Sequence, residues 1–202
     1  MDKPELLLDP AVSRQKFERE IALYRQLEDE HFQHGRWILK AEFPEVFVVF
    51  AVPHLKPPSI VFGAIIDFTN YDLWPPSVRL VDPFTKIPYK GRELPSRLSR
   101  MVPAVTPPDV AVLGLVAQPQ EQFLMQFHDP EDVPFLCLPG VREYHDHPGH
   151  TGDDWLLHRG KGEGTLYFLL NTIYRYGVAP MNGYAIEMRL AITGYTRREI
   201  PE

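Results

Sequence analysis

Residues 71–80 read YDLWPPSVRL, and this stretch decides how the surrounding chain is organised. Two consecutive prolines, Pro75 and Pro76, favour a turn, because proline has a fixed φ angle and no N–H to donate to a helix or a sheet. The segment from Asn70 to Pro76 is therefore predicted to be a turn, and residues 77–81 are predicted to form a short strand after it.

Three more strands are predicted before this turn, at residues 37–43, 46–52 and 59–68. Residues 46–52 read VFVVFAV and are apolar throughout, which is typical of a strand that is covered on both faces. Pro44 separates this strand from the one before it, because proline interrupts the hydrogen-bond ladder of a sheet. Four strands in close succession predict an antiparallel β-meander.

An amphipathic helix is predicted ahead of these strands. Asp9 is a good N-cap, and Pro10 fits the first helical position, where a missing N–H costs nothing. Gly35 is the expected end of the helix. Residues that suit one face of an amphipathic helix recur at spacings of three and four along this segment: Phe17, Ile21, Tyr24, Leu27 and His31.

A second helix is predicted at residues 166–176. Strict alternation over residues 184–193 predicts a final half-buried strand. Residues 82–110, with six prolines, and residues 139–164, with six glycines, are predicted to be irregular. The order helix, strands, loop, helix and strand indicates an α+β fold, in a single domain that spans residues 1–202.

Composition and charge argue against several classes of protein. Of the 202 residues, 44% are hydrophobic and 24% are charged, which is close to the globular average. A net charge of −6 argues against nucleic-acid binding, because such proteins carry a basic face that neutralises phosphates. No run approaches the roughly 18 apolar residues that cross a membrane. The single cysteine excludes an internal disulfide, so we expect a reduced, cytoplasmic setting with no membrane or nucleic-acid partner.

The residues best suited to chemistry lie in CLPGVREYHDHPGH, residues 137–150. If this stretch is extended, Glu143, His145 and His147 point to one side of the backbone, because they are spaced by two. His150 follows closely and is a reserve ligand or base. The candidate site residues are Cys137, Glu143, His145 and His147.

Three interpretations of these residues are open. Cys137 can be a buried structural cysteine that precedes an ordinary surface loop. The four side chains can bind zinc, since thiolate, carboxylate and imidazole are all zinc ligands, although structural zinc sites usually use at least two cysteines. Cys137 can also be a nucleophile whose pKa an imidazole lowers or whose proton it takes, while Glu143 fixes the imidazole tautomer. Spacing alone does not separate the last two.

The order of helix, meander and the turn at 71–80 resembles the ubiquitin-conjugating enzyme fold, in which a YP…PP-x-V-x-F turn enters the last meander strand. In that family a catalytic cysteine follows, then a tryptophan, then a helix. This chain has Cys137, Trp155 and its second predicted helix in the same order, and the resemblance covers residues 10–180. It implies an antiparallel meander flanked by an N-terminal helix and by a helix after an active-site loop at 139–164.

The four candidate site residues, in the order Cys, Glu, His and His, resemble the signature of bacterial proteins named CEHH, first described as predicted metal-binding domains. Such proteins belong to antiphage-defence operons that also encode a ubiquitin-activating-like enzyme, a ubiquitin-like protein and a deconjugating peptidase. The resemblance implies that Cys137 carries the ubiquitin-like protein as a thioester and passes it to an amine of an unknown target protein, with no cofactor and no metal. The alternatives are a non-catalytic zinc-binding module of the same residues and an inactive scaffold that only docks partners.

One departure from the eukaryotic family bears on the mechanism. Eukaryotic members place a His-Pro-Asn turn ahead of the cysteine, and its asparagine supports the oxyanion. This chain lacks that turn, and none of its asparagines lies shortly before Cys137. Losing one oxyanion donor typically costs about 2.7–4 kcal/mol of transition-state stabilisation. We therefore expect His145 or His147 to act as general base or oxyanion partner, with Glu143 orienting one of them.

Overall fold

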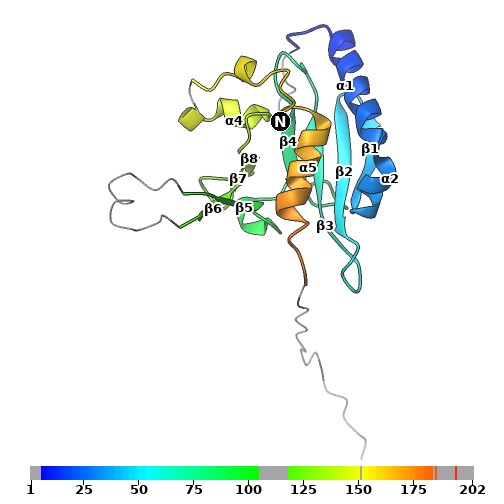
Figure 1. Ribbon diagram of the computed structural model, residues 1–202, viewed down its shortest axis with the longest axis vertical. Helices are drawn as coiled ribbons and strands as arrows, with labels where there is room; N and C mark the ends of the chain where they lie inside the picture. The colour runs from blue at the N-terminus through cyan, green and yellow to red at the C-terminus, as the bar shows by residue number, and fades with distance from the viewer. Residues whose placement is uncertain (1–5, 105–117, 151, 184, 186–193, 195–202) are drawn as a thin grey trace, which may run out of the picture.

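A four-stranded antiparallel sheet forms the centre of the computed structural model (Figure 1). The structure describes residues 6–104, 118–150, 152–183, 185 and 194. Each strand of the sheet pairs with the next in sequence, which confirms the predicted meander. The strands are β1 (Arg36–Glu42), β2 (Glu45–Val52), β3 (Ser59–Asp67) and β4 (Ser77–Val81).

Strand β2 is buried on both faces, as its continuous apolar sequence predicts. Every residue from 46 to 52 is buried. Val48 and Phe50 belong to the main core on one side of the sheet, whereas Phe47 and Val49 belong to a smaller cluster on the other side. The central strand therefore contributes to two separate apolar contacts.

The predicted first helix is present but divided into α1 (Pro10–Arg25) and α2 (Glu28–Gln33). Asp9 caps α1 by accepting a backbone N–H of the first turn at 2.9 Å, as expected. The chain then turns into β1 at Gly35, whose φ is +74°. A Cβ at this position would lie 2.1 Å from the carbonyl oxygen of Ala51, so the turn requires glycine.

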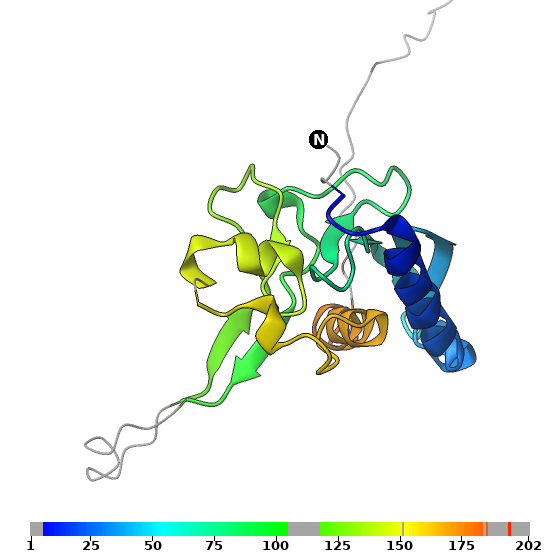
Figure 2. The ribbon, with the colours of Figure 1, turned by 90° about the horizontal axis from the view of Figure 1, so that it is seen from above.

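The predicted second helix is α5 (Leu166–Gly177), and Thr165 caps it by accepting the N–H of Phe168 at 3.3 Å. Helices α1 and α5 lie side by side across one face of the sheet (Figure 2). Their apolar faces meet the sheet in one core, although α1 also buries Ser13 and Glu20 on this side and α5 buries Thr172. Fully buried side chains of this core include Tyr24, Phe50, Phe62, Phe68, Leu169 and Leu170.

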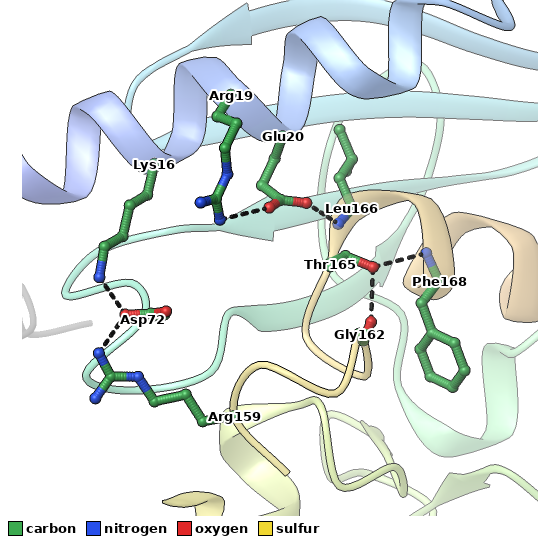
Figure 3. A network of polar contacts seen from close by, with 9 residues as sticks. All are labelled: Lys16, Arg19, Glu20, Asp72, Arg159, Gly162, Thr165, Leu166 and Phe168. Atoms are coloured by element: carbon green, nitrogen blue, oxygen red, sulfur yellow. Dashed lines mark hydrogen bonds and ion pairs between the residues drawn. The ribbon is translucent and has the colours of Figure 1, made fainter.

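A buried carboxylate ties α1 to the start of α5 (Figure 3). Glu20 is only 4% exposed, and its Oε2 accepts the backbone N–H of Leu166 at 3.2 Å. Arg19 donates to the other carboxylate oxygen at 3.3 Å. The first N–H groups of a helix have no partner within the helix and favour a nearby negative charge. Glu20 therefore fixes the position of α1 against the N-terminus of α5.

Two short two-stranded sheets follow β4 and carry the chain to the candidate cysteine. β5 (Ser99–Val102) pairs with β6 (Gln120–Phe123), and β7 (Met125–Gln126) pairs with β8 (Phe135–Leu136). Strand β5 corrects the prediction that residues 82–110 are irregular throughout. Its partner β6 comes much later in the chain, with Ser99 opposite Phe123, so local patterning could not indicate the pairing.

The segment 139–164 is also more regular than the predicted loop, because it contains three short helical turns. They are α4 (Arg142–Asp146) and the 3₁₀ turns η2 (Pro148–His150) and η3 (Trp155–Leu157). A further 3₁₀ turn, η1 (Gly91–Glu93), lies earlier in the chain. In Figure 2, α5 lies between α1 and the segment that holds α4.

An antiparallel sheet with helices in separate parts of the chain confirms the α+β class. The strand predicted at 184–193 falls, apart from Ala185, outside the described residues. Within the described ranges, no helix combines the length and the apolar character needed to cross a membrane.

His31 is a polar side chain that the core encloses without pairing it. It is 1% exposed, and its ring stacks on that of Tyr24 with 4.0 Å between the ring centroids. In the part of the chain that the structure describes, neither ring nitrogen has a hydrogen-bond partner. Burial lowers the pKa of His31 below its ordinary value of 6.5, and the nearby charge of Arg36 lowers it further.

The free energy of unfolding is therefore expected to fall as the pH drops below 6.5, because the unfolded chain then binds a proton that folded His31 resists. Urea unfolding at about pH 7.5 and about pH 5 measures this loss. His31→Phe keeps a flat ring against Tyr24 but does not titrate, so it should lose less stability over the same interval. An equal loss in both proteins would contradict the assignment.

Candidate active site

Cys137 lies directly after β8, with its thiol beside His150. Its backbone N–H donates to the carbonyl oxygen of Leu124 at 2.7 Å, which holds the residue at the end of the small β7–β8 sheet. The distance between Cys137 Sγ and His150 Nε2 is 3.5 Å. The side chain is half-buried, and this burial raises the pKa of the Cys137 thiol, while Arg100 opposes the rise. A thiol of raised pKa needs a base for its proton, and His150 is within reach.

The ring of His150 lies flat against that of Tyr144. Their centroids are 3.8 Å apart and the interplanar angle is 23°. The Tyr144 hydroxyl donates to the carboxylate of Asp153. Burial and this hydrogen bond to a carboxylate raise the pKa of Tyr144 to about 12, so the hydroxyl keeps its proton at neutral pH.

His158 lies between two carboxylates and completes this cluster. Its Nε2 is 2.6 Å from Asp153 Oδ1, and its Nδ1 is 2.6 Å from Glu163 Oε2. Burial alone would lower the pKa of His158, but the two carboxylates raise it above its ordinary value. Hydrogen bonds from Tyr144 and His158 lower the pKa of Asp153. The two carboxylates therefore favour the protonated form of His158.

The predicted one-sided arrangement of Glu143, His145 and His147 is wrong, because the first two lie in α4 and the third ends it. Side chains two residues apart in a helix point about 200° apart, whereas in a strand they share a face. The three residues accordingly make separate contacts.

Glu143 binds the start of β4. Its carboxylate accepts the hydroxyl of Ser77 and, at 3.4 Å, the backbone N–H of Val78. These contacts join α4 to the strand that follows the double-proline turn. The expected bond from Glu143 to an imidazole is not among the contacts of the described residues.

His145 closes the loop on itself. Its Nδ1 is 2.8 Å from the carbonyl oxygen of Asp153, and its Nε2 is 2.6 Å from that of Pro139. Both ring nitrogens are thus occupied by the backbone on either side of α4. This side chain links the two ends of the segment that carries His150.

His147 packs between His128 and Phe135, at centroid distances of 5.1 Å from each ring. Its Nδ1 accepts the N–H of Gly149 at 3.1 Å, so in the neutral ring Nε2 carries the proton. That Nε2 is 3.0 Å from His128 Nε2. His147 therefore contacts β8 rather than the thiol of Cys137.

The double-proline turn holds this loop against the rest of the fold (Figure 3). The carboxylate of Asp72 binds Lys16 of α1 and, at 2.9 Å, Arg159 of the loop. The carbonyl oxygen of Asp72 accepts the indole N–H of Trp155 at 3.0 Å. Arg142 donates to the carbonyl oxygen of Thr69 at 2.6 Å. The turn is thus the common support of α1 and of the candidate site.

A metal centre is not assembled by these residues. Within residues 6–104, 118–150, 152–183, 185 and 194, no group of three or more His, Cys, Asp or Glu side chains is arranged to hold a metal ion. The zinc module that the sequence left open therefore gains no geometric support here.

Sequence reasoning gave Tyr144 and Asp153 no role and kept His150 only in reserve. The signal that indicates them is a spacing of three, at Tyr144, His147 and His150. Backbone bonds follow this spacing: His147 N–H donates to Tyr144 O at 3.3 Å, and His150 N–H donates to His147 O at 3.0 Å. A helical path of this kind brings Tyr144 and His150 together.

Two comparisons with known proteins cover most of the chain. The model of a family described as Y4jH-like matches residues 8–181. The chain is also 44% identical over 194 residues to a protein of Sinorhizobium fredii (strain NBRC 101917 / NGR234) named "Uncharacterized protein y4jH", with 95% of each chain covered. The family match includes every residue of the candidate site.

Glu143→Ala is expected to lower the free energy of unfolding by about 1.5–3 kcal/mol, the usual worth of hydrogen bonds to a charged group. The reactivity of Cys137 in the folded protein should stay unchanged, because the contacts of Glu143 lie on β4. Urea unfolding and alkylation by iodoacetamide measure the two effects. Asp146→Ala, at an exposed position of the same helix, is the matched control. Normal stability with lost thiol reactivity would instead assign Glu143 to the chemistry.

Proposed function

The chain belongs to the Y4jH-like family, and we propose that it is a ubiquitin-conjugating-type acyltransferase in which Cys137 carries a ubiquitin-like protein as a thioester and transfers it to an amine. The observation that carries the proposal is the 3.5 Å contact between Cys137 Sγ and His150 Nε2. It pairs the chain's single cysteine with a group that can accept its proton.

The arrangement of elements supports the same proposal. An antiparallel meander, β1 to β4, is covered by α1 and α5, and the double-proline turn leads into β4. The cysteine, the buried Trp155 and α5 then follow in the order that the conjugating-enzyme fold has. The match to the CEHH signature remains a prediction that belongs to this proposal.

The first chemical step is transthioesterification. Cys137 Sγ forms a bond to the thioester carbonyl carbon of the ubiquitin-like protein, and the bond from that carbon to the sulfur of the activating enzyme breaks. His150 takes the proton of the Cys137 thiol, and the departing thiolate is protonated in turn. Because burial raises the pKa of Cys137, this route needs a base rather than a preformed thiolate.

The second step is aminolysis. The amine of the target attacks the thioester, loses a proton to His150, and leaves Cys137 as a free thiol when the amide has formed. His145 is less suited to this role than expected, because both of its ring nitrogens are occupied by backbone carbonyl oxygens. His150 replaces His145 and His147 as the general base of the proposal.

Space for the amine lies beside His150. An open hollow of about 480 Å³ is bordered by this histidine, by the exposed side chains of the double-proline turn and by η3. Its lining includes Leu73, Trp74, His150, Asp153 and Leu156. A hollow of this size next to the proposed base accommodates a side chain of the target protein.

The proposed partners are the ubiquitin-like protein, its activating enzyme and a target protein, and the proposed location is the cytoplasm. The domain itself needs no cofactor, since the activating enzyme uses the ATP.

Incubation with the cognate activating enzyme, ubiquitin-like protein and ATP should add one ubiquitin-like unit, visible in a non-reducing gel and removed by a thiol reductant. Cys137→Ala should abolish this adduct, because the chain has no other cysteine. If wild-type protein forms no reductant-sensitive adduct with an activating enzyme that is demonstrably active, the proposal is wrong.

His150→Gln should slow discharge of the adduct to a free amine by about 100-fold or more, since a positioned general base typically contributes 10²–10⁴. Loss of the gel-shifted band with time after amine addition measures the rate. His54→Gln is the matched control, because His54 contacts the carbonyl oxygen of Met181 instead. Equal rates for the two variants would remove His150 from the mechanism.

A further inference from the structure

We propose that Asp153 is a positioning residue of the cysteine site, which acts on Cys137 through Tyr144 and His150. The inference rests on the proposed function only in treating Cys137 as a nucleophile. It goes beyond that function because it assigns a role to a carboxylate that contacts neither the thiol nor its base.

His150 needs a support that a carboxylate does not supply directly. In the described part of the chain, no carboxylate is hydrogen-bonded to its ring, unlike the histidine of a Ser-His-Asp triad. The ring is held instead by its face, 3.8 Å from the ring of Tyr144. Its backbone donates to His147 O at 3.0 Å, which fixes the main chain but leaves the side chain free to rotate. The ring of His147 is farther away, at a centroid distance of 5.5 Å, so Tyr144 is the main support of the His150 ring.

Tyr144 is held in turn by Asp153. The phenol hydroxyl donates to Asp153 Oδ2, so one end of the ring is anchored while its face supports His150. Because Asp153 has a lowered pKa, it stays an anion at neutral pH and accepts this hydrogen bond permanently. The carboxylate of Asp153 thus fixes the ring of Tyr144, and this ring supports the imidazole of His150.

Three side chains from different parts of the loop converge on Asp153. Tyr144 and His158 donate to its two carboxylate oxygens, the latter at 2.6 Å, and His145 contacts its backbone oxygen at 2.8 Å. His158 is itself braced by Glu163 at 2.6 Å. These contacts fix Asp153 although its side chain is about one-third exposed.

Position matters here because a catalytic group must be held within about 0.5 Å and 10–20° of its productive geometry. The proton of Cys137 passes to His150 Nε2 and no further, since stacked rings share no hydrogen bond. Asp153 therefore takes no proton in the reaction. Its contribution is to keep the Nε2 of His150 aimed at the thiol.

The test is the rate at which iodoacetamide alkylates Cys137 in the folded wild-type protein, measured across the pH range. Asp153→Ala should lower the rate at neutral pH by about 100-fold, to the rate of His150→Gln, since both remove the effect of a positioned base. At high pH the rates should converge, because the thiol then ionises without help. Asp154→Ala is the matched control: it removes the same charge one residue later, where the carboxylate only caps η3.

A role exercised through His150 predicts that Asp153→Ala has no further effect in a His150→Gln background, whereas an unrelated structural loss would add to it. Faster alkylation in Asp153→Ala would show that the loop merely shields Cys137, and an equal loss in Asp154→Ala would show a general charge effect. Either result overturns the proposal.

Tyr144→Phe covers the case in which Asp153→Ala does not fold. This variant removes the hydroxyl that Asp153 holds and keeps the ring that faces His150, so a slower neutral-pH alkylation is expected and an unchanged rate overturns the proposal. Alkylation needs no partner protein. An Asp153→Ala variant that alkylates normally would overturn this proposal, whereas a wild-type protein that forms no ubiquitin-like adduct would overturn the proposed function. The two outcomes are therefore distinguishable.

Discussion

The carboxylate of Asp72 joins helix α1 to the segment that carries the candidate site. It is shared by Lys16, on the helix that covers the sheet, and by Arg159, on the segment that carries the candidate site. Burial alone would raise the pKa of Asp72, but the hydrogen bonds from these two cations lower it, so the carboxylate stays charged between them. The segment 139–164, which consists mostly of short turns, is thus attached through Asp72 to the helix that covers the sheet.

The proposed cysteine site differs from a conventional activated thiol in the surroundings of its sulfur. Low-pKa cysteines lie beside cations or helix N-termini that stabilise the thiolate. Burial dominates around Cys137 and favours the neutral thiol. A thiol of this kind depends on His150 to take its proton, which under the proposed mechanism suits a residue that passes a thioester to an amine.

The frame was predictable because its signals are local: the cap and proline at Asp9 and Pro10, the apolar run at 46–52 and the double-proline turn each act over a few residues. The site was not. The spacing of the histidines favoured a strand, but residues 142–146 are helical. Contacts with residues distant in sequence stabilise this helix, such as the hydrogen bonds that Glu143 accepts from Ser77 and Val78. The role of Cys137 stays a prediction, and its contact with His150 depends on tertiary structure that the sequence spacing does not indicate.

The bond between Glu20 and the N–H of Leu166 spans 146 positions of the chain. Ribosomes add about 5–20 residues per second, so roughly 7–30 s separate the synthesis of Glu20 from that of Leu166, although Arg19 and Tyr71 contact the same carboxylate and are made earlier. The meander can pair as it emerges, since its strands are neighbours in sequence. The contact between α1 and the N-terminus of α5 can therefore form only after the meander and the cysteine loop have been made.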